Sequence, residues 1–175
     1  MSAPLPTTSD AARPRGLFAM AGLSGGLVLL VGVIAWALGA PCLAPPLGVT
    51  AYLLAKDPKA AVNSPRNIVI GHVIGVAAGL GSAGAFGVLG EPSALTGTFV
   101  LGHALGSALA IVLTVSLTEG LRCPHPPAAA TTLVASLGLL SLQGGVLAFM
   151  AGVAVLAGCS FALRRSRPSA SPPKK

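Results

Sequence analysis

The sequence alternates between long apolar stretches and short polar ones. Two apolar segments, Leu47–Ala55 and Ala128–Leu140, are too short to cross a membrane as helices, and each follows a proline pair. A helix needs roughly 20 residues to cross about 30 Å of hydrocarbon. Four other apolar segments are long enough: Leu17–Gly39, Ile68–Leu89, Leu95–Leu117 and Leu142–Leu163. The pattern predicts an all-α membrane protein with four long spans plus two short ones.

The basic residues indicate how the two short segments run. If both were re-entrant, Lys56, Lys59 and Arg66 would lie opposite the basic termini, against the positive-inside tendency. The first short segment can reach across the bilayer core if it is partly extended. Six extended residues, Pro41–Pro46, reach about 20 Å at ~3.3 Å each, and the nine helical residues Leu47–Ala55 add about 13 Å. We therefore expect six crossings in a bacterial inner membrane, with both termini cytoplasmic.

A short motif recurs along the chain and suggests an internal repeat. Each copy reads C-x-x-P-P-x-x-x-T, and the two copies lie 81 residues apart: Cys42, Pro45, Pro46 and Thr50, then Cys123, Pro126, Pro127 and Thr131. Each copy lies between two long spans. The prediction is two inverted three-crossing repeats, about 17–89 and 95–163, each with a proline-broken short helix, an architecture known from secondary transporters.

Composition excludes the soluble classes of protein. Hydrophobic residues make up 53% of the chain and charged residues 9%, whereas a soluble domain carries roughly 25% charged residues. The net charge of +7 comes from residues at the membrane edges, so the expected partner is the lipid bilayer and no nucleic acid. No nucleophile, base and orienting group occur together. We expect no enzyme, no cofactor and no metal site, and the three cysteines contain no C-x-x-C pair.

The ends of the chain differ from its centre. Residues 1–15 are polar and proline-rich and predict a disordered lead-in, residues 16–163 form the transmembrane domain, and residues 164–175 form a basic cytoplasmic tail. A cleaved signal peptide is the competing interpretation, because Arg13 and Arg15 precede the apolar run Gly16–Ala40. That run is longer than a typical signal-peptide apolar region.

The proline pairs are candidates for a binding site. Proline is tolerated in the first helical turn, so Pro126 and Pro127 would start a helix whose next donors begin at Ala128, as Pro45 and Pro46 would in the first copy. A helix start carries a positive partial charge that favours an anion. The alternative is that the prolines only bend the chain and that protein carbonyls or water satisfy the helix starts.

Several polar side chains near these segments are further candidates. His125 precedes the second proline pair, and His72 lies inside a long apolar stretch, where an ionisable residue is a functional candidate. Arg66 offers a planar set of donors that suits a small planar anion, and Asn67 follows it. Thr50 and Thr131 would donate hydroxyls to a substrate or bond back to carbonyls one turn earlier.

Two short segments of the sequence resemble the signature of the HPP family of integral membrane proteins. They are Cys123–Leu133, which contains His125-Pro126-Pro127-Ala128, and Ser64-Pro65-Arg66-Asn67 followed by Gly71-His72. The resemblance covers roughly Leu17 to Leu163. It implies a multi-spanning protein, usually described with four transmembrane helices, and nitrite transport of the kind reported for plastid and cyanobacterial members.

The sequence thus predicts a transporter or channel for a small inorganic anion, with nitrite as the candidate that the resemblance supplies. Two alternatives stay open: a membrane scaffold or sensor that transports nothing, and a protein that passes metal ions or protons through its histidines. Whether the chain forms a homo-oligomer is also open.

Overall fold

A computed structural model describes residues 14–40, 43–140, 142 and 144–166, and this part of the chain is helical without strands. The predicted lead-in and tail, and Cys42 of the first motif, lie outside or mostly outside the described residues. The elements are α1 (Pro14–Ala37), α2 (Pro45–Lys56), the 3₁₀ helix η1 (Ala61–Asn63), α3 (Pro65–Ala85), α4 (Leu101–Gly120), α5 (Pro127–Ser136) and α6 (Gly145–Ser166). The all-α prediction is confirmed, and four of the helices are long and apolar enough to cross a membrane.

The helix boundaries differ from the apolar boundaries where capping decides them. Helix α3 starts at Pro65, earlier than Ile68, because Ser64 Oγ accepts the Asn67 N–H at 3.2 Å. Helix α4 starts at Leu101, whereas the apolar stretch begins at Leu95. The residues between them form a loop, and at the helix start His103 Nδ1 accepts the Val100 N–H at 3.2 Å.

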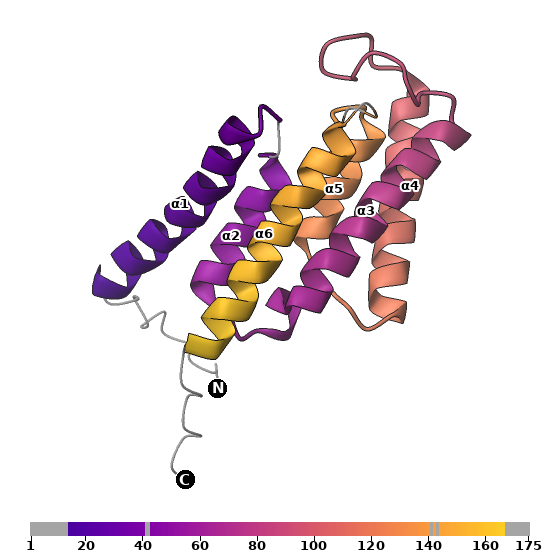
Figure 1. The fold of residues 1–175 in the computed structure, drawn as a ribbon. Coiled ribbons are helices and arrows are strands. Elements are labelled where there is room, and N and C mark those ends of the chain that lie inside the picture. The colour runs from indigo at the N-terminus through magenta and orange to yellow at the C-terminus, as the bar shows by residue number, and fades with distance from the viewer. Residues whose placement is uncertain (1–13, 41–42, 141, 143, 167–175) are drawn as a thin grey trace, which may run out of the picture.

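Successive helices run in opposite directions (Figure 1). Helix α2 leads from the end where α1 finishes to the end where α3 begins, and α5 leads likewise from α4 to α6. With 12 and 10 residues, α2 and α5 are about 18 and 15 Å long at ~1.5 Å per residue. The six α-helices therefore alternate in direction, and each half of the chain reads long, short, long. The superposition of the two halves as inverted repeats stays a prediction.

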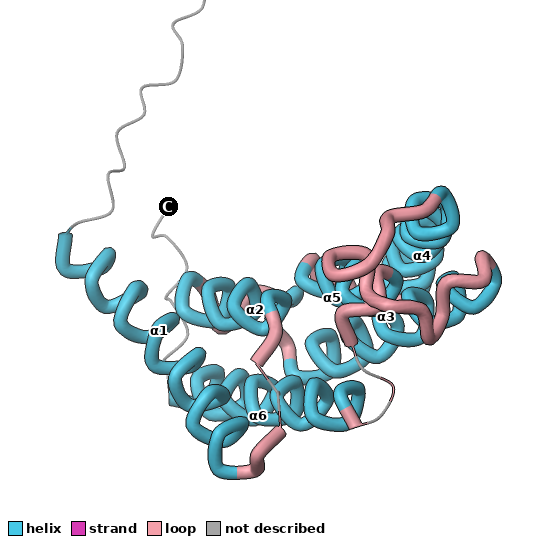
Figure 2. Tube along the Cα trace, turned by 90° about the horizontal axis from the view of Figure 1, so that it is seen from above, coloured by secondary structure: helices cyan, strands magenta, loops and turns pink. Residues whose placement is uncertain are grey.

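The helices form two bundles of three, and each bundle takes its third helix from the other half of the chain (Figure 2). Helices α1 and α2 pack with α6, whereas α4 and α5 pack with α3. The bundles meet where α3 contacts α6 and α2 contacts α5. The two short helices therefore lie at the interface between the bundles.

A stripe of small residues brings α3 and α5 close together. A Cβ atom built on Gly71 would lie 2.8 Å from the His125 Cβ, and one on Gly75 would lie 2.7 Å from the Ala128 carbonyl oxygen. One on Gly79 would lie 2.5 Å from the Ala135 Cβ. Small residues at this spacing let membrane helices approach closely, and α3 makes its most extensive contacts with α5.

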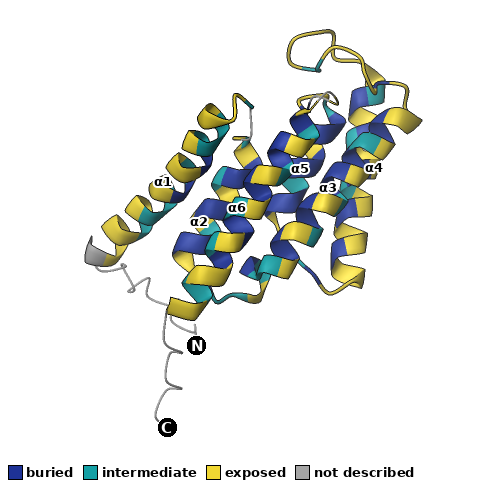
Figure 3. Cartoon of the chain, viewed as in Figure 1, coloured by how far each residue is buried: buried dark blue, intermediate teal, exposed yellow. Residues whose placement is uncertain are grey.

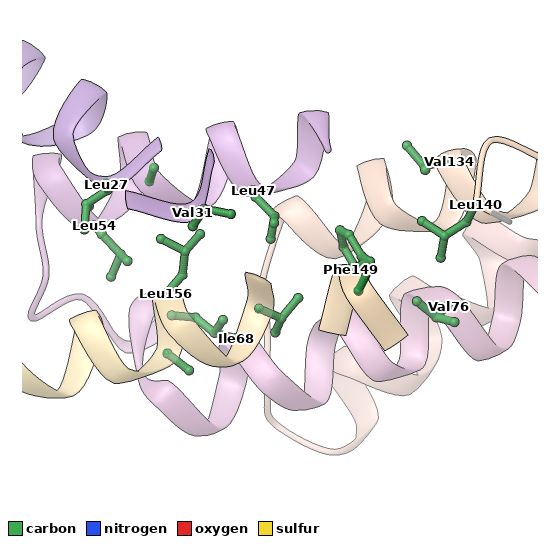
Figure 4. Packing of buried hydrophobic residues seen from close by; sticks show 14 residues of the cluster. Leu27, Val31, Leu47, Leu54, Ile68, Val76, Val134, Leu140, Phe149 and Leu156 are labelled. Carbon is green, nitrogen blue, oxygen red and sulfur yellow. The ribbon is translucent and has the colours of Figure 1, made fainter. Parts of the chain in front are cut away.

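The buried apolar side chains fill the space between α1, α2, α3 and α6. Leu47, Leu54, Ile68, Phe149 and Leu156 are fully buried there (Figure 4). The outward faces are apolar too, and the yellow, exposed residues of α1 and α4 in Figure 3 include many leucines and valines. An apolar outside as well as an apolar inside is what a lipid solvent requires.

Candidate functional site

Four polar side chains meet at the interface between the two bundles. Thr50 of α2 and His72 of α3 lie with Thr131 of α5 and His125 of the loop before α5, and all four are at most 3% exposed. Thr50 Oγ1 lies 3.2 Å from His72 Nε2 and 3.2 Å from His125 Nε2. On the other side of the same ring, His72 Nδ1 lies 2.6 Å from Thr131 Oγ1. We call these four residues the polar centre.

The repeated motif explains the position of both threonines. In each short helix the threonine comes one turn after the second proline, and its hydroxyl oxygen lies within hydrogen-bond distance of that proline's carbonyl oxygen, Thr50 to Pro46 at 3.2 Å and Thr131 to Pro127 at 3.4 Å. His72 therefore has an equivalent threonine on either side, one from each copy of the motif. The 81-residue repeat was found from the sequence, but this shared histidine was not.

The loop before α5 is held in place by residues of α3. Asn67 Nδ2 donates to the carbonyl oxygens of Ala61 at 3.0 Å and Pro124 at 3.3 Å. Arg66 donates to the carbonyl oxygens of Leu121 and Arg122, both at 3.4 Å. Arg66 and Asn67 therefore brace the segment that carries His125.

The starts of the two short helices are satisfied by their own chain. The Ala128 N–H donates to the His125 carbonyl at 2.9 Å, and the Leu47 N–H donates to the Ala44 carbonyl at 2.9 Å. Prolines supply no N–H at Pro45, Pro46, Pro126 and Pro127. Protein carbonyls therefore satisfy these two N–H groups, as the alternative interpretation of the proline pairs expects. The imidazoles and hydroxyls are therefore the polar groups that this region offers to a ligand.

Access to the polar centre differs between the two ends of the molecule. At the end that carries the α4–α5 loop, a cavity of about 100 Å³ is lined by His125 together with Thr118 and Glu119. At the other end a cavity of about 270 Å³ stops at Leu80 and Ala135. Ala135 lies one turn, about 5.4 Å, beyond Thr131. Of these two cavities of the described residues, the smaller one borders the polar centre at His125, and the larger one is lined by none of its four residues.

None of the charged side chains of the described residues is buried with the polar centre. The buried polar side chains of the described residues are threonine, serine, asparagine and histidine, with no carboxylate, lysine or arginine among them. Glu119, which is exposed, lines the same cavity as His125. Within the described residues, no three His, Cys, Asp or Glu side chains gather as a metal site would require.

The sequence matches the family described as HPP, transmembrane region, over residues 9–172. The chain belongs to the HPP family. No curated protein and no solved structure matches it. The family and the four long apolar helices show that it is a multi-pass integral membrane protein in contact with the lipid bilayer. The motifs that suggested the family, His125-Pro126-Pro127 and Arg66-Asn67, are the ones that shape its polar centre.

Two contacts in this HPP transmembrane region were not found from the sequence. The Phe149 ring of α6 packs edge-on against His72, with ring centroids 5.5 Å apart, and the Val62 carbonyl of η1 accepts from His125 Nδ1 at 2.8 Å. Neither residue type carries a signal for such a role. The third histidine, His103, lies away from the polar centre at the start of α4, stacked on Phe99.

Proposed function

We propose that this HPP-family protein is a transporter or channel that moves a small inorganic anion across the membrane. The observation that carries the proposal is the polar centre: two imidazoles and two hydroxyls, buried together at the interface between two helix bundles. Nitrite is the first candidate, because the resemblance to the family supplies it.

Burying these polar groups inside a membrane protein is energetically unfavourable, and a role in function would explain why they are there. Polar side chains inside a membrane are rare and mark ion or substrate pathways. Imidazole and hydroxyl groups donate hydrogen bonds, which a dehydrated anion requires, and they do so without a permanent charge that would hold the ion too tightly. These donors now bond one another and the Val62 carbonyl, so an anion would bind by replacing some of these hydrogen bonds and leave when they re-form.

The arrangement of the bundles supports movement across the membrane. Secondary transporters with repeated halves bind near the midplane, between two units that rock against each other. Here the polar centre lies between two bundles, with one cavity lined by His125 and another, toward the opposite end, that is lined by Ala135 but by no residue of the polar centre. This asymmetry corresponds to one state of an alternating-access cycle.

The charges suggest the orientation in the membrane. The ends of α2, α4 and α6 and the start of α3 lie at one end of the molecule (Figure 1), and next to them in sequence are Lys56, Lys59, Arg66, Arg122 and Arg164, with Asp57 and Glu119. The α3–α4 loop at the opposite end carries Glu91. By the positive-inside tendency, the basic end faces the cytoplasm of a bacterial inner membrane. The cavity at His125 is then the cytoplasmic one, and both termini are cytoplasmic.

Flux measurements test the proposal. Purified protein in liposomes is assayed with nitrite, nitrate, formate, chloride and bicarbonate, and protein-free liposomes give the background leak. We expect protein-dependent flux of at least one anion, and a loss of roughly tenfold or more in His125→Ala. His103→Ala is the matched control, because it removes a buried histidine away from the polar centre and should keep the flux.

Two results would contradict the proposal. If no anion crosses in wild-type liposomes, the chain is better described as a scaffold or sensor. If His125→Ala transports like the wild type while inserted and monodisperse, the polar centre is a packing device and not the path of the ion.

A further inference from the structure

We propose that the polar centre is a proton relay and that each anion crosses together with one proton. This inference rests on the proposed function and adds the coupling ion. It is carried by the order of the hydrogen bonds, which join Thr131, His72, Thr50 and His125 into one continuous chain that ends at the Val62 carbonyl.

One end of the chain fixes which atoms donate. A carbonyl oxygen only accepts, so His125 Nδ1 carries a hydrogen and donates it to the Val62 oxygen. In a neutral imidazole the other nitrogen is then an acceptor. His125 Nε2 therefore accepts, and the Thr50 hydroxyl, 3.2 Å away, is its donor.

The donors and acceptors at the other three residues follow from this assignment at His125. With the Thr50 hydrogen directed to His125 Nε2 and not to the Pro46 carbonyl, which is also 3.2 Å away, Thr50 Oγ1 accepts from His72 Nε2–H at 3.2 Å. His72 Nδ1 is then an acceptor, and the Thr131 hydroxyl donates to it at 2.6 Å in preference to the more distant Pro127 carbonyl at 3.4 Å. All donors thus point the same way, from Thr131 toward His125. Hydrogen bonds with a common direction are what a proton relay needs, and they strengthen one another.

Proton transfer along these hydrogen bonds needs no other reactant. A proton arriving at Thr131 Oγ1 displaces the hydroxyl hydrogen to His72 Nδ1, and the Nε2 proton of His72 passes to Thr50 Oγ1. The Thr50 hydrogen passes to His125 Nε2, which leaves one positive charge on His125 and neutral groups elsewhere. His125 lines the cavity that Glu119 shares, so this proton can leave through that cavity.

The surroundings explain why a proton would accompany the anion. The elements packed around the two histidines contribute Thr50 from α2, Thr131 from α5, Phe149 from α6 and Val62 from η1, and none of these side chains is charged. Glu119 of α4 is the one ionisable side chain that shares the cavity with His125. An unpaired charge in such an environment costs several kcal/mol. A proton taken up with the anion makes the loaded polar centre neutral overall.

The test measures anions and protons in the same liposomes. A pH-sensitive dye is trapped inside, an inward gradient of the transported anion is applied, and the membrane voltage is clamped with potassium and an ionophore. We expect acidification of the interior with one proton per monovalent anion. Thr50→Val removes the hydroxyl at nearly constant shape and should lower proton uptake and anion flux together by roughly tenfold or more, whereas Thr50→Ser should retain both.

The matched control is Thr132→Val. Thr132 is a buried threonine next to Thr131 that bonds Thr114 Oγ1 at 2.7 Å and lies outside the relay, so one proton per anion should be retained. Anion flux without acidification in the wild type would overturn the coupling and leave the proposed function standing. Wild-type coupling in Thr50→Val would overturn the relay. Absence of any anion flux would overturn the proposed function, and the coupling with it.

Discussion

Gly79 of α3 offers a direct test of how closely α3 and α5 must approach. In Gly79→Ala the new Cβ would lie 2.5 Å from the Ala135 Cβ and 2.7 Å from the Thr132 carbonyl oxygen. Carbon atoms in contact prefer about 3.5–4.0 Å, so α5 would have to move away by about 1 Å. Backbone atoms on α5 prevent a side-chain rotation from relieving the clash.

The displacement would affect stability and the polar centre together. Overpacking of a close contact costs about 1–3 kcal/mol, and for soluble domains of 150–250 residues each kcal/mol lowers the melting temperature by roughly 2–4 °C. The same movement would stretch the 2.6 Å hydrogen bond between Thr131 and His72 beyond the range of a hydrogen bond. We therefore expect a melting temperature several degrees lower in detergent and reduced anion flux in liposomes.

Gly81→Ala is the control for this substitution. Gly81 lies two residues further along the same helix, is exposed, and its added Cβ would meet nothing within 4 Å. It should be neutral or slightly stabilising, because alanine favours a helix over glycine by about 1 kcal/mol. Equal melting temperatures and equal flux for the two variants would show that the glycine stripe does not set the helix spacing, and the reasoning would fail.

Three further predictions concern the rest of the molecule. In a background without the native cysteines, an impermeant thiol reagent added outside intact cells should label Ser93→Cys and miss Lys59→Cys; the reverse pattern would rule out the proposed orientation. Arg66→Lys should lower the melting temperature about as much as Arg66→Gln, since its two nitrogens donate to two different carbonyls at the end of α4; full stability in the lysine variant would indicate that charge alone matters. Asn63→Ala should cost about 1–3 kcal/mol, measured as a fall in melting temperature, because its side-chain nitrogen donates to two carbonyls at 2.9 and 2.7 Å; an unchanged melting temperature would contradict this bracing role.

Length and hydropathy predicted the four long helices because a membrane span requires about 20 apolar residues whatever surrounds it. The same reasoning placed the start of α4 at Leu95, six residues before Leu101. Leu95 and Phe99 are apolar and exposed in the loop, so hydropathy could not separate loop from helix there. The hydrogen bond from Val100 N–H to His103, which caps the helix, has no apolar signature.

The sequence by itself also determined the two proline-led helices and the family, because proline acts locally on the residues next to it and the motifs are contiguous. It did not determine that Thr50 and Thr131 share His72, or that the helix starts are satisfied within the chain. Those facts depend on how closely α3 and α5 pack, and that spacing follows from glycines on one helix facing backbone on another. Contacts between residues distant in sequence are decided by the tertiary packing, since no local pattern encodes the distance between two helices.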